Sequence, residues 1–131
     1  MRYLPDKLYG DQIRLKQILI NLTKNALKFT LRGNIHILAS YDEEQAKLIV
    51  HVVDTGKGIS NREMNVLFRQ FGKVERTGNM NVEGIGLGLA ICKRIVSNSG
   101  GEITVSSYGE NKGSTFKFSM QMDHPTSLQL E

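Results

Sequence analysis

Residues 11–30, DQIRLKQILINLTKNALKFT, predict an amphipathic helix. Gly10 and Asp11 supply a start signal for this helix, and Gly33 with Asn34 supplies a stop signal. Apolar side chains recur between them every three to four positions, the spacing of one helix face, namely Leu15, Leu19, Leu22, Ala26 and Phe29. The helix therefore has one face to bury against a core.

A second face of the same helix carries Asn21, Asn25 and Lys28, which are spaced so that they lie side by side. Asparagine in a helix interior costs about 0.5–0.7 kcal/mol relative to alanine. Two of them on one face indicate a polar task. An amide oxygen suits Mg²⁺, and a lysine suits phosphate. The plainer alternative is that the asparagines are solvated or cap a neighbouring loop.

The rest of the chain predicts four strands and two further helices. Alternating or continuous apolar residues predict strands at 35–41, 47–54, 102–108 and 114–122. Ser60 and Glu63 have the spacing of a capping box, which predicts a short helix to about Phe68. A further helix is expected over 87–96, after a loop at 69–83. Helices grouped against a largely antiparallel sheet predict an α/β (α+β) two-layer sandwich. We expect one domain over 1–131, with a core at about 4–122 and a tail at 123–131.

Composition argues against a disordered segment, a collagen and a disulfide-rich toxin. The 131 residues are 40% hydrophobic and 23% charged, as in an ordinary globular domain. No apolar run approaches the ~20 residues of a membrane span, and no apolar signal core begins the chain. The single cysteine, Cys92, forbids an internal disulfide. The net charge of +4 is concentrated in residues 1–30, and aromatic residues are only 7%. A small phosphorylated ligand is therefore a better expectation than nucleic acid.

Seven of the 13 glycines lie between Gly56 and Gly88, and five of the seven form two clusters, DTGKGI at 54–59 and GIGLGL at 84–89. Closely spaced glycines let backbone amides approach an anion, and a helix N-terminus adds a favourable dipole. Strand ends and helix starts use glycines for purely structural reasons as often. A P-loop and a dinucleotide fingerprint are both absent from the sequence. The three histidines are scattered and give no metal-ligand spacing.

Four motifs together resemble the catalytic ATP-binding domain of sensor histidine kinases. Residues 11–30 resemble the N box, 54–59 the G1 box, Leu67-Phe68-x-x-Phe71 the F box, and 84–91 the G2 box, in the family's order. The resemblance covers about 4–122. It implies the Bergerat fold shared with gyrase B and heat-shock chaperone ATPases: a mixed, mainly antiparallel sheet, helices on one face, and ATP beneath a lid.

The resemblance also implies roles for single residues. Asn25 is implied as the Mg²⁺ ligand and, with Lys28, as catalytic; Asn21 would help to hold phosphates. Asp54 would accept the hydrogen bond of the adenine amino group, which disfavours GTP, and Phe68 and Phe71 would anchor the lid. The resemblance places further residues in the ATP site: Gly56, Gly58, Ile59, Phe71, Lys73, Arg76, Gly84, Gly86, Leu87, Gly88 and Leu89.

The implied activity is transfer of the γ-phosphoryl group from Mg-ATP to a histidine. Related ATPases carry a glutamate base where this chain has Asn21, which cannot take a proton, so water-driven turnover is disfavoured. His36, His51 and His124 are not expected to be acceptors. The acceptor would belong to a separate dimerisation domain of a longer cytoplasmic or membrane-anchored kinase that serves a response-regulator receiver. No contact of this domain with nucleic acid or membrane is expected. The alternatives are a nucleotide-binding pseudokinase that acts as an interaction module, and a chaperone- or topoisomerase-type ATPase.

Overall fold

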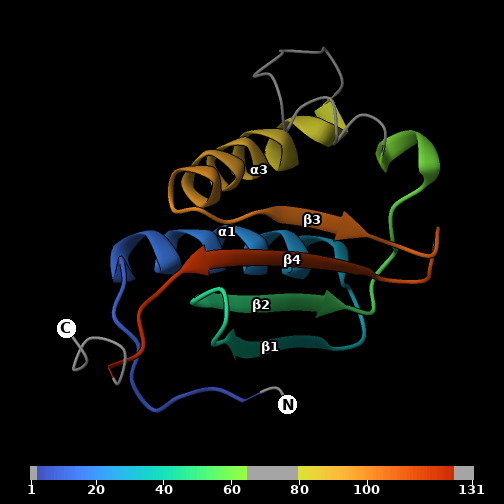
Figure 1. The fold of residues 1–131 in the computed structure, drawn as a ribbon. Coiled ribbons are helices and arrows are strands. Elements are labelled where there is room, and N and C mark those ends of the chain that lie inside the picture. The colour runs from blue at the N-terminus through green and yellow to red at the C-terminus, as the bar shows by residue number, and fades with distance from the viewer. Residues whose placement is uncertain (1–2, 65–79, 126–131) are drawn as a thin grey trace.

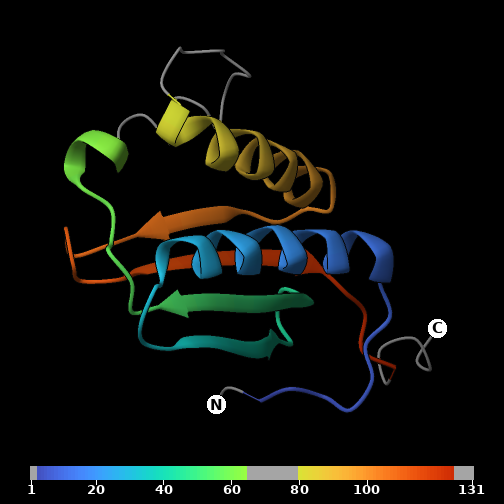
Figure 2. The same ribbon diagram turned by 180° about the vertical axis from the view of Figure 1, so that it is seen from behind.

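A computed structural model of the chain describes residues 3–64 and 80–125, which form two layers. One layer is a four-stranded sheet in the order β1-β2-β4-β3, and the other holds the helices α1 and α3 on one face of it (Figure 1). In the view from behind, α1 passes in front of β4, and α3 lies next to β3 (Figure 2). This arrangement confirms the predicted α/β two-layer sandwich. No helix in the described ranges is long and apolar enough to cross a membrane.

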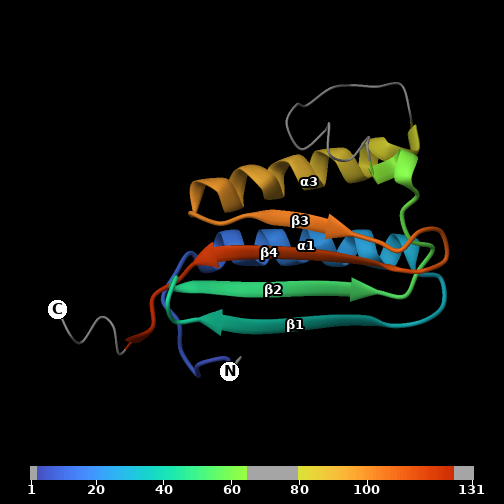
Figure 3. The same cartoon turned by 45° about the vertical axis from the view of Figure 1, so that its right-hand side comes forward.

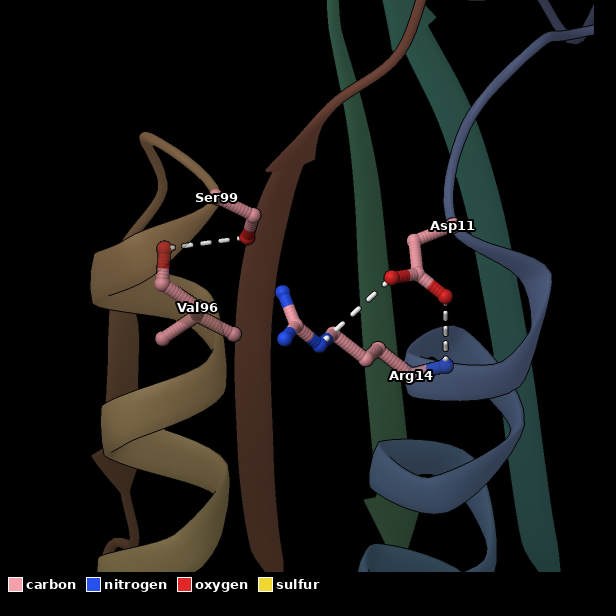
Figure 4. Close-up of polar contacts among 4 residues, drawn as sticks. All are labelled: Asp11, Arg14, Val96 and Ser99. Atoms are coloured by element: carbon pink, nitrogen blue, oxygen red, sulfur yellow. Dashed lines mark hydrogen bonds and ion pairs between the residues drawn. The ribbon is translucent and has the colours of Figure 1, made fainter.

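α1 spans Gln12–Phe29, within one residue of the predicted bounds at either end. Asp11 caps it: one carboxylate oxygen accepts the Arg14 N–H at 3.1 Å, and the other lies 3.5 Å from Nε of the same arginine (Figure 4). Such a cap satisfies a backbone donor that the first turn leaves unpaired. The inward stripe is buried at Ile18, Leu22 and Ala26, with 0–2% of each residue exposed. α1 packs there against β2 and α3.

The strands are β1 (Ile35–Asp42), β2 (Lys47–Asp54), β3 (Ile103–Ser106) and β4 (Ser114–Gln121). All three pairings between them are antiparallel, as Figure 3 lets the reader follow. Every second residue of β2 and β4 is buried beneath the helices, because successive side chains of a strand point to opposite faces. β1 is an edge strand and is mostly exposed.

α3 begins earlier than the sequence predicted. It spans Met80–Asn98, so the GIGLGL cluster lies inside the helix and does not precede it. Each glycine costs about 1 kcal/mol relative to alanine in a helix interior. The apolar pattern nevertheless keeps helical spacing straight across the glycines, at Val82, Ile85, Leu89, Cys92 and Val96. The prediction of a helix start at residue 87 gave the glycines too much weight and this pattern too little.

Local signals end and begin the remaining elements as expected. The Ser99 hydroxyl donates to the carbonyl of Val96 at 3.1 Å (Figure 4), and Gly100, at φ +73°, ends α3 in a left-handed conformation. Ser60 caps the helical residues 61–64: its hydroxyl accepts the Glu63 N–H at 3.2 Å and donates to the Glu63 carboxylate at 3.0 Å. The rest of this predicted short helix, and most of the predicted loop, lie outside the described residues.

The loop that follows β2 is fastened to the turn between β3 and β4. The Gly113 N–H donates to the Gly56 carbonyl at 3.1 Å. The Ser107 hydroxyl accepts the Ile59 N–H at 3.0 Å and donates to the Gly113 carbonyl at 2.6 Å. One hydroxyl therefore connects two loops that lie far apart in the sequence. The backbones approach so closely that a Cβ atom at Gly58 would lie 2.0 Å from the Gly109 carbonyl oxygen.

We predict that Gly58→Ala destabilises the fold more than Gly100→Ala does. Both glycines have φ +73°, so the backbone strain of about 1–2 kcal/mol is common to both variants. Only Gly58 faces a backbone atom; a Cβ at Gly100 would meet the end of the Gln121 side chain at 3.2 Å, which can move aside. Urea unfolding should show that Gly58→Ala lowers the free energy of unfolding by about 2 kcal/mol or more beyond the decrease caused by Gly100→Ala. Equal losses would contradict the close approach.

Candidate functional site

The Asp54 carboxylate lies at the end of β2, on the face of the sheet that the helices cover. It is 4% exposed, and the register places it opposite Ser114, the first residue of β4. One of its oxygens accepts the Ser114 hydroxyl at 2.6 Å, and the other accepts the Gly56 N–H at 2.9 Å. A buried carboxylate requires such donors. Each oxygen retains a further lone pair for an outside donor.

Asn25 is a second buried polar side chain, with 8% of the residue exposed. It lies on α1 next to the buried stripe, one turn after Asn21. Its amide nitrogen has no hydrogen-bond partner within the described part of the chain. An unpaired buried amide costs about 1–3 kcal/mol, and such a group in a folded protein calls for an explanation. The position fits a residue that binds a polar ligand through its amide.

Asn21 faces α3. Its amide nitrogen lies 3.9 Å from the Cys92 sulfur, and a Cβ at Gly88 would lie 4.0 Å from its side-chain carbon. Cys92 is fully buried, and desolvation raises the pKa of its thiol to about 11, although the contact with Asn21 opposes the shift. The thiol is therefore protonated at neutral pH and serves the packing of α1 on α3.

A pocket of about 480 Å³ opens where the last turn of α1 meets the loop after β2. Among the described residues that line it, three are cationic and none is acidic. They are Lys28, Arg32 and Lys57, with Leu31, Thr55, Gly56 and Asn111 as the remainder. This charge gives the pocket a positive potential suited to an anion. Of the predicted site residues, the pocket brings together Lys28 and Gly56.

A second pocket, of about 360 Å³, shares Thr55 and Asn111 with the first and includes Asp54, Ser107 and Ser114 in its lining. The sequence alone did not point to Arg32, Asn111 or either of these serines. No local pattern marks Ser114 as the partner of Asp54, because their meeting depends on the register between strands 60 positions apart. Gly113-Ser114 directly after a polar turn is the one available signal.

Two further predicted residues contribute to the core, and several others fall outside the described residues. The Leu89 side chain is 1% exposed and belongs to the core. Ile59 is half-buried and packs against the same core. Gly84, Gly86 and Leu87 lie in the first half of α3. Phe68, Phe71, Lys73 and Arg76 fall at positions outside the described part of the chain.

Comparisons with curated proteins relate the chain to signalling kinases. It is 37% identical over 131 residues to the signal transduction histidine-protein kinase BarA of Escherichia coli K12, which covers 98% of this chain and 14% of that protein. It is 41% identical over 124 residues to the sensor histidine kinase GacS of Pseudomonas protegens, covering 92% of this chain and 13% of that one. The chain thus spans about a seventh of these relatives.

Solved structures of histidine kinases are similar to the chain, and a family model also matches it. A full-length ShkA structure in complex with AMPPNP has TM-score 0.68 and 32% identity, covering 86% of this chain and 22% of that one. The catalytic domain of the histidine kinase ThkA has TM-score 0.64 and 31% identity, covering 86% and 68% respectively. Residues 10–124 match the model of the histidine kinase-, DNA gyrase B- and HSP90-like ATPases, and the chain belongs to this family.

Proposed function

We propose that this chain is the catalytic ATP-binding domain of a longer two-component sensor kinase. It binds Mg-ATP and donates the γ-phosphoryl group to a histidine on a separate dimerisation domain. The phosphoryl group then passes to a response-regulator receiver, and the domain works in the cytoplasm. The observation that carries the proposal is the Asp54 carboxylate, buried and held by Ser114 and Gly56 at 2.6 and 2.9 Å. Its relatives BarA and GacS are named as histidine kinases.

Asp54 would recognise adenine. An ionised carboxylate only accepts hydrogen bonds, and its two internal donors fix its orientation while leaving lone pairs for the exocyclic amine. Guanine carries an oxygen at the corresponding position, so the two acceptors would face each other without a proton between them. Because a buried unpaired acceptor is costly, this mismatch would favour ATP over GTP.

Asn25 and Lys28 would hold the triphosphate end. The unpaired amide nitrogen of Asn25 fits a phosphate oxygen, and the amide oxygen is the kind of ligand that Mg²⁺ prefers. When bound, Mg²⁺ neutralises charge on the phosphates. Lys28 is exposed at the cationic pocket, one turn further along α1, where it would orient the phosphate chain. These residues would position the phosphoryl group and stabilise charge, which is what phosphoryl transfer requires.

Asn21 favours transfer to another protein over hydrolysis. A water nucleophile needs a base, and an amide cannot accept the proton. Its amide is moreover turned toward Cys92, at 3.9 Å. The attacking imidazole would therefore come from outside this domain.

We predict that Asp54→Asn weakens binding of a non-hydrolysable ATP analogue about 10- to 100-fold and lowers the preference over GTP. The loss corresponds to one charged hydrogen bond, about 1.5–3 kcal/mol. Ser114→Ala keeps the carboxylate but removes one of its hydrogen-bond donors, so this variant should lose less affinity for the analogue than Asp54→Asn does. Asp42→Asn, at the end of β1, is the matched control because Asp42 also accepts backbone amides, those of Glu44 and Gln45. Calorimetric titration measures all four proteins; unchanged affinity in Asp54→Asn would refute this role.

We predict opposite effects of Asn25→Ala on stability and binding. Without nucleotide, the variant should be as stable as the parent or more stable, because an unpaired buried amide is removed and helix propensity improves. With Mg²⁺ and ADP, it should lose the thermal stabilisation that the parent gains. Thr23→Ala, elsewhere on α1, controls for helix propensity and should keep the response to ligand. A destabilised variant that still responds to Mg-ADP would contradict the assignment.

We expect the chain to phosphorylate a histidine only in trans. The test mixes it with a dimerisation domain carrying an acceptor histidine, in the presence of labelled ATP and Mg²⁺. Acid-labile label should appear on the added domain and not on His36, His51 or His124, with Asn25→Ala inactive. Phosphate release without an acceptor would instead favour an ATPase. Nucleotide binding without transfer to any acceptor domain would favour the pseudokinase.

A further inference from the structure

The outer face of α1 exposes aliphatic side chains at seven-residue intervals. Ile13 is 80% exposed, Ile20 is 52% exposed and Leu27 is 62% exposed. At 3.6 residues per turn, this stripe lies opposite the buried stripe of Ile18 and Leu22. Single exposed aliphatic residues are ordinary, but a row at heptad spacing has the pattern of a coiled-coil seam. We call Ile13, Ile20 and Leu27 the outer seam of α1.

Basic residues flank the outer seam. α1 contains Arg14, Lys16, Lys24 and Lys28 and no aspartate or glutamate. Lys16 lies on one side of the seam and Lys24 on the other, as helical spacing dictates. Arg14 is paired with Asp11, but no ion pair joins Lys16 or Lys24 to a carboxylate in the ranges that the structure describes. The seam thus has the positive flanks that a negatively charged partner would complement.

The geometry points to an amphipathic helix as the partner, with aliphatic residues at heptad spacing and carboxylates beside them. Its aliphatic residues would cover the outer seam, and its carboxylates would meet Lys16 and Lys24, as at the edges of a coiled coil. The seam runs 14 residues, about 21 Å of helix at 1.5 Å per residue, so the partner needs about four turns. Such a helix would bind the opposite side of α1 from Asn25.

Two other possible partners fit the outer seam less well than an acidic helix does. A second copy of α1 would bring lysines against lysines, which is unfavourable beside a seam. An anionic membrane would attract the lysines, but helices that lie in a membrane surface present a broad apolar face. The outer seam is only one residue wide, and Lys24 and Gln17 border it directly. A single partner helix matches this width.

The probe is a labelled 28-residue helical peptide with leucines at its heptad core positions and glutamates on both flanks. A second peptide replaces every glutamate by lysine. Fluorescence anisotropy against the complete chain should show saturable binding of the acidic peptide alone, weakening as salt is raised. The Ile20→Gln/Leu27→Gln double variant should bind at least about tenfold more weakly. Leu38→Gln is the matched control, because Leu38 is 57% exposed but lies on β1.

A charge exchange completes the test. The Lys16→Glu/Lys24→Glu variant should no longer bind the acidic peptide and should bind the basic peptide instead. Thermal melts show that each variant is folded, and no readout needs nucleotide, so failure here is separate from failure of the proposed activity. The inference is overturned if the acidic peptide does not bind saturably, or if the seam variant binds it as tightly as the parent. Seam-dependent binding to phosphatidylserine vesicles, or a seam-dependent dimer in sedimentation, would equally overturn it in favour of a membrane or a second copy.

Discussion

The pairing of β2 with β4 is the constraint on which the rest of the structure depends. It runs from Lys47 opposite Gln121 to Asp54 opposite Ser114 and sets which residues of both strands face the helices. A shift of one residue would send every inward side chain to the solvent face. The apolar residues therefore fix the register, and the register in turn brings a hydroxyl to the buried carboxylate. The polar site is thus positioned by the packing of the apolar core.

The site concentrates polar groups that a stable core would avoid. Among the described residues, the buried polar or charged residues are Asn25, Asp54 and Ser114. Asp54 and Ser114 are hydrogen-bonded to each other, whereas the Asn25 amide nitrogen finds no partner in the part of the chain that the structure describes. A protein keeps an arrangement of this kind at the expense of stability when the group is needed for binding. The same helix that carries Asn25 inward carries the outer seam on its opposite side.

Much of this fold follows from sequence. The strands lie within two residues of their predicted bounds, because apolar alternation and polar turns are local signals. The start of α1 was likewise predicted from neighbouring residues, Gly10 and Asp11. The start of α3 was missed, since glycine content and apolar spacing pointed in opposite directions. The motif pointed to Asp54 as a candidate, but nothing local pointed to Ser114 or Ser107, because these serines reach the loop after β2 only through tertiary pairing.

The long separation between Asp54 and Ser114 has a consequence during synthesis. The hydrogen bond joins residues 60 positions apart. At about 5–20 residues per second, the ribosome needs roughly 3–12 s after Asp54 to add Ser114. For that interval β2 has β1 on one side but lacks its other neighbour, so its second edge and the carboxylate remain open to water or to a chaperone. The contact between Asp54 and Ser114 can therefore form only after β4 has been synthesised.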